Sequence, residues 1–136
     1  MRAHLAELQT DLLALGLPED PALFTRLLDY AELLCRWNQK IRLVGPNDLA
    51  TIVREQLVDA CGFIGPIAEL DHPHLIDVGS GGGLPGLVLA IALADRHLTL
   101  IEPIHKKTAF LMHAAHALGL TNTHIHTGRV DELGRI

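Results

Sequence analysis

The apolar residues of the first 71 positions recur at helical spacing. A first helix is predicted by a row of leucines, Leu5, Leu8, Leu12 and Leu15. Asp20 and Pro21 provide an N-cap and a first-turn proline for a second helix that ends near Asn38. Asp48 is placed to cap a third helix, which continues to Cys61. Residues 1–71 are therefore predicted to form a helical cap.

After residue 71 the pattern changes to short apolar strands that alternate with helices. Strands are predicted at residues 75–78, 98–102 and 123–126, and helices at 85–94 and 105–118. Strands and helices alternating at this spacing indicate a parallel sheet with right-handed crossovers. The predicted fold class is therefore α/β, with an N-terminal helical cap (residues 1–71) followed by a βαβαβ unit (residues 72–136).

Composition limits the class of protein. The chain has 136 residues, of which 49% are apolar, and 16 acidic against 11 basic side chains give a net charge of -5. This length suits one domain and needs no disulfide scaffold. The longest apolar run, residues 84–94, is too short for the roughly 20 residues that cross a bilayer. We therefore expect a soluble cytoplasmic protein with no membrane partner, whose Cys35 and Cys61 are reduced.

The acidic balance argues against a general nucleic-acid coat, although basic residues cluster locally. Between residues 36 and 54, four basic side chains accompany the single acid Asp48; they are Arg36, Lys40, Arg42 and Arg54. A short cationic patch of this kind can hold phosphates even within an acidic protein. The alternative is an ordinary solvated face.

A glycine-rich loop between the first predicted strand and the next helix is the most informative segment. It reads Asp77-Val-Gly79-Ser-Gly81-Gly-Gly83-Leu-Pro-Gly86. Glycines at this place let a ligand approach the backbone where a Cβ would clash. The spacing Gly81-x-Gly83-x-x-Gly86 also fits the dinucleotide-binding pattern, so an NAD site and a loop without any ligand both stay open as alternatives.

Two carboxylates favour S-adenosylmethionine over a dinucleotide. Asp77, two residues before the first glycine, would repel the phosphates of a dinucleotide at the helix N-terminus. The same carboxylate can accept hydrogen bonds from the ammonium of S-adenosylmethionine. Glu102 ends the second strand, where a carboxylate can accept both hydroxyls of an adenosine ribose. We predict a cofactor site that includes Asp77, Gly79, Gly81, Gly83 and Glu102.

Residues 75–133 resemble the bacterial small-subunit (16S) ribosomal RNA guanine-N7 methyltransferases, also called glucose-inhibited division protein B. The similar text is LIDVGSGGGLPGLVLAIALADRHLTLIEPIHKKTAFL, followed by GRVDEL. Residues 33–43 are similar to the tryptophan-asparagine motif of the same family. The resemblance implies the first half of a Rossmann-like class I methyltransferase fold that acts in rRNA processing. The chain departs from the usual family residues at Arg42-Leu43-Val44, Gln56 and Ala60.

The resemblance also implies roles for individual residues. Gly79 and Leu84 would line the cofactor loop, and Glu102 would hold the ribose. Val130 and Asp131 would meet the adenine edge. Contacts to 16S rRNA are expected from six basic residues: Arg36, Lys40, Arg42, Lys106, Lys107 and Arg129. For Lys106 and Lys107, ordinary solvated helix lysines are the alternative.

No catalytic side chain is predicted. N7 of guanine has no proton, so its methylation needs no general base, and catalysis would rest on holding the reacting atoms in line. Nine histidines occur, but none stands with cysteines or carboxylates at ligand spacing, so no metal site is expected. We expect Trp37 to be a core anchor of the cap, with base stacking as the alternative.

The family fold has seven strands, whereas this sequence stops at Ile136, just after the third. We therefore expect a C-terminally truncated member of the family. In such a chain, the strand at residues 75–78 would be an exposed apolar edge, open to self-association. The alternative function is an inactive cofactor-binding or RNA-associated remnant without turnover.

Overall fold

The computed structural model describes residues 2–133 of the chain. The cap contains α1 (Arg2–Ala14), α2 (Pro21–Asn38), α3 (Leu49–Thr51), a π-helical turn (Ile52–Leu57), α4 (Val58–Cys61) and α5 (Ile64–Ala68). The remainder contains β1 (His74–Val78), α6 (Gly86–Ala92), β2 (His97–Glu102), α7 (His105–Ala117), β3 (Thr123–Thr127) and α8 (Val130–Leu133). The predicted α/β class, with strands that alternate with helices after residue 71, is confirmed.

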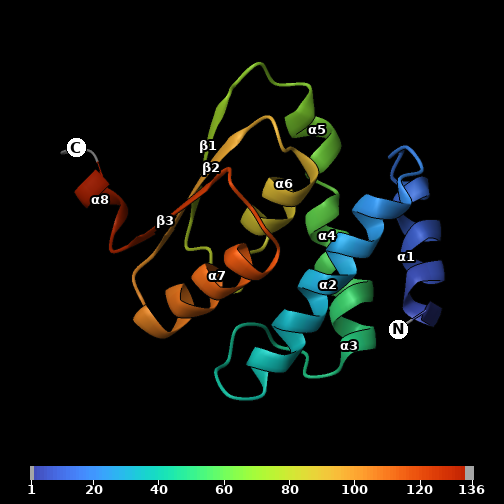
Figure 1. Ribbon diagram of the computed structural model, residues 1–136, viewed down its shortest axis with the longest axis horizontal. Coiled ribbons are helices and arrows are strands. Elements are labelled where there is room, and N and C mark those ends of the chain that lie inside the picture. Colours follow the sequence, from blue (N-terminus) through green and yellow to red (C-terminus); the bar gives the residue numbers. More distant parts are fainter. Residues whose placement is uncertain (1, 134–136) are drawn as a thin grey trace.

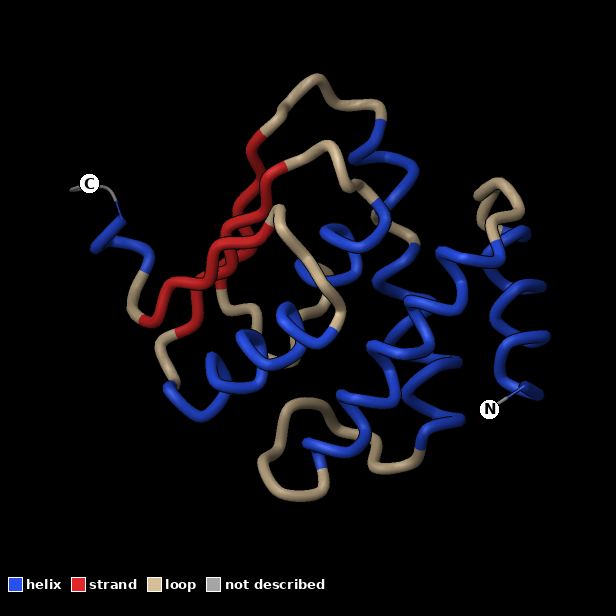
Figure 2. Tube along the Cα trace, in the orientation of Figure 1, coloured by secondary structure: helices blue, strands red, loops and turns tan. Residues whose placement is uncertain are grey.

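The three strands form one parallel sheet in the order β1-β2-β3. Leu75 pairs with Leu98, and Leu98 pairs with Thr123, so the carboxyl ends of all three strands meet at one edge. Figure 2 shows α6, α7 and the whole cap on one side of the sheet, whereas the other side is open and α8 lies beyond the carboxyl end of β3. On that open side, Ile76 and Val78 of β1 are 61% and 58% exposed.

The cap packs against α6 and α7, which lie between it and the sheet (Figure 1). One continuous core joins Leu12 of α1 and Phe24 of α2 to Leu87 of α6 and Phe110 of α7. The Trp37 ring lies 5.5 Å from that of Phe110. Trp37 therefore anchors the end of α2 to α7 and has one side occupied by aromatic packing.

The predicted N-caps of the second and third helices are confirmed, whereas the helical segments between residues 49 and 68 differ from the prediction. The side chain of Asp20 accepts a hydrogen bond from Leu23 N, and that of Asp48 from Thr51 N. The predicted third helix contains the π-helical turn, in which backbone hydrogen bonds join residues five apart instead of the four of an α-helix. Helix α5 was not predicted. It forms because Pro66 falls in the first turn, where its missing N–H costs no bond, and because Ile64 is buried.

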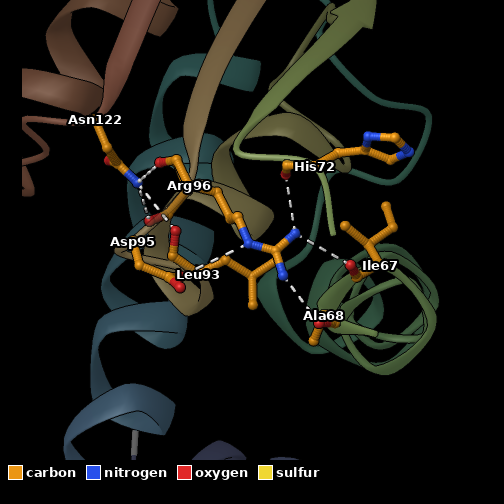
Figure 3. Close-up of polar contacts among 8 residues, drawn as sticks. Ile67, Ala68, His72, Leu93, Asp95, Arg96 and Asn122 are labelled. Atoms are coloured by element: carbon orange, nitrogen blue, oxygen red, sulfur yellow. Dashed lines mark hydrogen bonds and ion pairs between the residues drawn. The ribbon is translucent and has the colours of Figure 1, made fainter. Parts of the chain in front are cut away.

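Arg96 fastens the end of the cap to the start of β2 (Figure 3). Its guanidinium donates to the carbonyls of Ile67, Ala68 and His72 at 3.3, 2.9 and 3.1 Å. The side chain of Asn122 donates to the Arg96 carbonyl at 3.0 Å and to two carbonyls at the end of α6. These bonds satisfy carbonyls at two helix ends that would otherwise lack partners.

Across the portion of the chain that the structure describes, none of the helices combines the length and the apolar character that a bilayer crossing would require.

Candidate functional site at the glycine loop

The glycine loop connects the carboxyl end of β1 to α6, at the edge where all three strands end. Three of its glycines have positive φ: Gly79 at 74°, Gly81 at 53° and Gly83 at 91°. A side chain at such values is strained, so the loop follows this path only because glycine occupies these positions. A Cβ at Gly79 would meet nothing within 4 Å, so the loop is open there, whereas a Cβ at Gly83 would lie 2.7 Å from Leu87 Cδ1, so this glycine serves packing against α6.

Glu102 lies directly against this loop. Its carboxylate is at the end of β2 and only 4% of the residue is exposed. Oε1 accepts a hydrogen bond from Gly81 N at 2.9 Å, and Oε2 accepts one from Ile104 N at 3.0 Å. Each carboxylate oxygen has a second lone pair, so both oxygens keep the capacity to accept a hydrogen bond from a ligand. The loop and this carboxylate therefore form one site.

Asp77 lies on the side of β1 that faces α6. Its Oδ2 accepts a hydrogen bond from Gly86 N at 3.0 Å, so the carboxylate satisfies a free N–H at the start of α6. Burial raises the pKa of the Asp77 carboxyl above 3.8, although the hydrogen bonds from Ser80 and Gly86 oppose this shift. Sequence reasoning missed this second role, because the spacing of nine residues is not a helix-capping signal.

The cap contributes to the loop through Tyr30. This fully buried side chain donates its hydroxyl to the Gly82 carbonyl at 2.6 Å. Burial, followed by the nearby Asp77 and Cys61, raises the pKa of Tyr30 well above 10.0, so the hydroxyl keeps its proton as a donor. A Cβ on Gly82 would come within 2.9 Å of Leu34 Cδ1. Gly82 therefore serves close packing between the cap and the loop.

The turn after β3 lies beside the end of β2. Gly128 N donates to the Glu102 carbonyl at 3.1 Å, which places the following Val130 and Asp131 near the same edge of the sheet. Both residues are exposed. The Asp131 carboxylate makes an ion pair with Arg129 at 3.5 Å. The predicted cofactor residues thus gather at the carboxyl edge of the sheet.

The predicted RNA-binding residues do not all come together. Arg36, Lys40 and Trp37 line one hollow of about 230 Å³ at the end of α2. Arg42 donates to the Gly45 carbonyl at 3.3 Å in the following loop. Lys106 and Lys107 lie in the first turn of α7, the helix against which Trp37 packs. Arg129 immediately precedes α8, which lies beyond the carboxyl end of β3 and far from α2 (Figure 1).

Three of the nine histidines have a ring contact. His113 lies 5.2 Å from the Trp37 ring, and the rings of His74 and His97 are 5.6 Å apart across β1 and β2. Among the residues whose positions are described, no three histidine, cysteine or acidic side chains gather in a way that could hold a metal ion.

Comparison with known proteins assigns the family. The family model for rRNA small subunit methyltransferase G matches residues 24–135. The chain is 40% identical to ribosomal RNA small subunit methyltransferase G of Ralstonia nicotianae, with 94% of this chain and 60% of that protein covered. It is 38% identical to the protein of the same name from Herminiimonas arsenicoxydans, with 87% of this chain and 55% of that one covered.

A third protein of that name, from a Janthinobacterium species, is 37% identical, with 88% of this chain and 54% of that protein covered. The chain thus spans between 54% and 60% of the length of these three relatives. The predicted resemblance is confirmed: the chain belongs to the rRNA small subunit methyltransferase G family, a family of methyltransferases.

Proposed function

We propose that the chain holds the S-adenosylmethionine site of an enzyme that methylates N7 of a guanine in 16S ribosomal RNA. The observation that carries this proposal is the contact between the buried Glu102 carboxylate and Gly81 N at 2.9 Å. A buried acid with spare lone pairs beside the glycine loop suits the ribose hydroxyls of an adenosine ligand. A dinucleotide would in addition bring its phosphates toward Asp77, whose carboxylate lies at the start of α6, and this favours a ligand without phosphates.

Each cofactor-site residue has a distinct part in the proposal. Glu102 would accept the ribose hydroxyls, and Asp77 would accept from the ammonium through Oδ1, because Oδ2 is engaged by Gly86 N. The main chain of Gly79, Gly81 and Gly83, with Leu84, would line the loop side. Val130 and Asp131 would border the adenine.

The reaction would need orientation rather than proton transfer. When bound, S-adenosylmethionine supplies an electrophilic methyl, which N7 takes through its lone pair while the sulfur keeps the bonding electrons. The residues of this chain would fix the methyl donor and keep the reacting atoms in line. Phosphates of the RNA would be held by Arg36, Lys40, Arg42, Lys106, Lys107 and Arg129, with the first two acting together at their shared hollow.

Three further expectations accompany this function. Because 16S rRNA is a cytoplasmic molecule in bacteria, we place the protein in the cytoplasm. We keep the division into a cap at residues 1–71 and a cofactor region at 72–136. Pairing of two copies through β1, where Ile76 and Val78 are exposed, is a further expectation that sedimentation velocity would test.

Calorimetry with S-adenosylhomocysteine and with NADH tests the cofactor site. We expect binding of the first and none of the second. Asp77→Ala and Glu102→Ala should each weaken S-adenosylhomocysteine binding more than tenfold, while Asp95→Ala, whose side chain is 83% exposed, should not change it. Unchanged affinity for both of the first two variants would overturn the site. Transfer of labelled methyl groups to small ribosomal subunits separates an enzyme from a cofactor-binding remnant.

A further inference from the structure

A second hollow lies between the cap and the glycine loop. It measures about 150 Å³ and is lined by Gln56, Asp59, Ala60, Phe63, Leu84 and Pro85. One lining residue is Leu84, which the proposed function places beside the cofactor. Its walls come from the π-helical turn and from the segment 58–63 that follows it. The hollow therefore adjoins the proposed cofactor site through Leu84.

The polar side chains of this hollow have no partners of their own. Within residues 2–133, no hydrogen bond or ion pair engages the Asp59 carboxylate or the Gln56 amide. A ligand that displaces water from these two groups must therefore supply hydrogen bonds to them. Phe63, which also lines the hollow, is 51% exposed, a large fraction for an aromatic residue. Proteins that recognise unpaired RNA bases use an exposed aromatic ring to stack on the base and polar side chains to hydrogen-bond to its edge, and this hollow offers both.

The acid selects among the bases. Guanine presents two adjacent donors on its Watson–Crick edge, N1–H and N2–H, and one carboxylate can accept both. Adenine and cytosine each place a ring acceptor beside their amino group, and uracil flanks its single donor with two carbonyls, so each would bring an acceptor toward the carboxylate. The neighbouring guanine O6 can accept a hydrogen bond from the Gln56 amide.

We propose that this hollow is the subsite for the target guanine, with Asp59 accepting from N1–H and N2–H, Gln56 donating to O6 and Phe63 stacking on the ring. This proposal rests on the proposed function. A guanine held by its Watson–Crick edge leaves N7 without a protein contact and open to the methyl donor. The π-helical turn at Ile52–Leu57 contributes Gln56 to the subsite, and such turns in helices often accompany functional sites.

The test measures binding of short single-stranded RNAs to the 136-residue chain by nuclear magnetic resonance titration. The RNAs are uridine pentamers whose central base is guanine, inosine or adenine. We expect the affinity to fall at least fivefold from guanine to inosine, which lacks the N2 amino group, and further for adenine. Shifts on titration should centre on the Gln56 side-chain amide and on Phe63.

Three variants separate the contacts. Asp59→Asn should reduce the preference for guanine over inosine to less than twofold, whereas Asp29→Asn, on an exposed position of α2 outside the hollow, should keep it. Phe63→Leu should weaken binding of all three RNAs at least fivefold, and Phe63→Tyr should restore it. Asp59, Asp29 and Phe63 are exposed, so the variants should keep the circular dichroism spectrum of the native chain.

The outcomes distinguish this subsite from the cofactor site. Asp59→Asn should bind S-adenosylhomocysteine as tightly as the native chain does. A guanine preference that survives Asp59→Asn, equal affinity of the native chain for all three RNAs, or the absence of any measurable binding would overturn the subsite while the cofactor result stands. Failure of S-adenosylhomocysteine to bind, with the guanine preference intact, would instead overturn the proposed function.

Discussion

The Tyr30 hydroxyl donates a hydrogen bond of 2.6 Å to the Gly82 carbonyl, joining the second helix of the cap to the glycine loop. Tyr30→Phe removes the donor and leaves a buried carbonyl without a partner, which costs about 1–3 kcal/mol. We expect the free energy of unfolding in urea to fall by this amount. S-adenosylhomocysteine binding should weaken as well, because the loop loses its attachment.

The matched control for Tyr30 is Thr10→Val, which removes a hydroxyl bonded to the Ala6 carbonyl at 3.1 Å on the exposed face of α1. There, water can take the place of the lost donor, so the free energy of unfolding should change by less than about 0.5 kcal/mol. Equal losses for the two variants would contradict a special role of Tyr30 at the loop.

Gly86 has no room for a side chain. A Cβ there would lie 2.5 Å from Asp77 Oδ2 and 2.9 Å from Leu100 Cδ2. Gly86→Ala should therefore lower the free energy of unfolding by about 1–3 kcal/mol through overpacking. Gly65→Ala is the control, because a Cβ at Gly65 meets nothing within 4 Å and alanine favours the helix by about 0.5–1 kcal/mol. Thermal unfolding of the two variants should shift in opposite directions.

Burial of Asp77 makes stability depend on pH. The carboxyl pKa is raised above 3.8 in the folded state, so the stability that its protonated form contributes is present below pH 3.8 and is lost as the pH rises through the folded pKa. Asp77→Asn removes this loss. Relative to the native chain, the variant should gain free energy of unfolding as the pH rises from 4 to 7, in urea titrations at each pH. A difference that stays constant or shrinks over that range would argue against the shift.

Arg96 should be worth more than an ordinary surface arginine. Its side chain is 13% exposed and donates to three carbonyls at the end of the cap. Arg96→Ala should lower the free energy of unfolding by about 2 kcal/mol or more, since bonds from a charged donor are lost and the carbonyls lose partners. Arg96→Lys should not restore it, because one ammonium cannot span the three acceptors.

Arg54→Ala is the comparison for Arg96. Its partner Glu55 lies 3.8 Å away and both side chains are 57% exposed, so the loss should stay below about 1 kcal/mol. Similar losses in free energy of unfolding for the Arg96 and Arg54 variants would contradict the inference that the hydrogen bonds of Arg96 fasten the cap to the sheet.

The strands and the glycine loop could be predicted closely from the sequence because their signals are local. Each strand is an apolar run between turn residues, and the observed boundaries of β1, β2 and β3 differ from the predicted ones by a single residue at one end. The caps Asp20 and Asp48 were equally local, since each side chain bonds to an N–H three residues later. Glu102 was expected near the glycine loop because parallel strands end at the same edge of a sheet, and both lie at the carboxyl ends of neighbouring strands.

Contacts between distant segments could not be predicted in this way. Tyr30 is 52 residues from Gly82 and Arg96 is 28 from Ala68, and no spacing rule links such pairs. The π-helical turn differs from an α-helix only in which carbonyl each N–H reaches, and the apolar pattern is similar for both. The predicted RNA-binding residues have the same charge, but charge does not fix their position: α8, which directly follows Arg129, lies far from α2 (Figure 1).

The central position of β2 gives the sheet an internal reference for hydrogen exchange. Within residues 2–133, it is the strand with a neighbour on each side, so its amide protons bond to β1 or β3 throughout. Those protons can reach deuterated solvent only when the sheet itself opens, and their exchange rate at Leu100 and Ile101 therefore measures opening of the whole core. The amides of β1 that point away from β2 should exchange rapidly, and the contrast between these two sets separates local fraying from global unfolding.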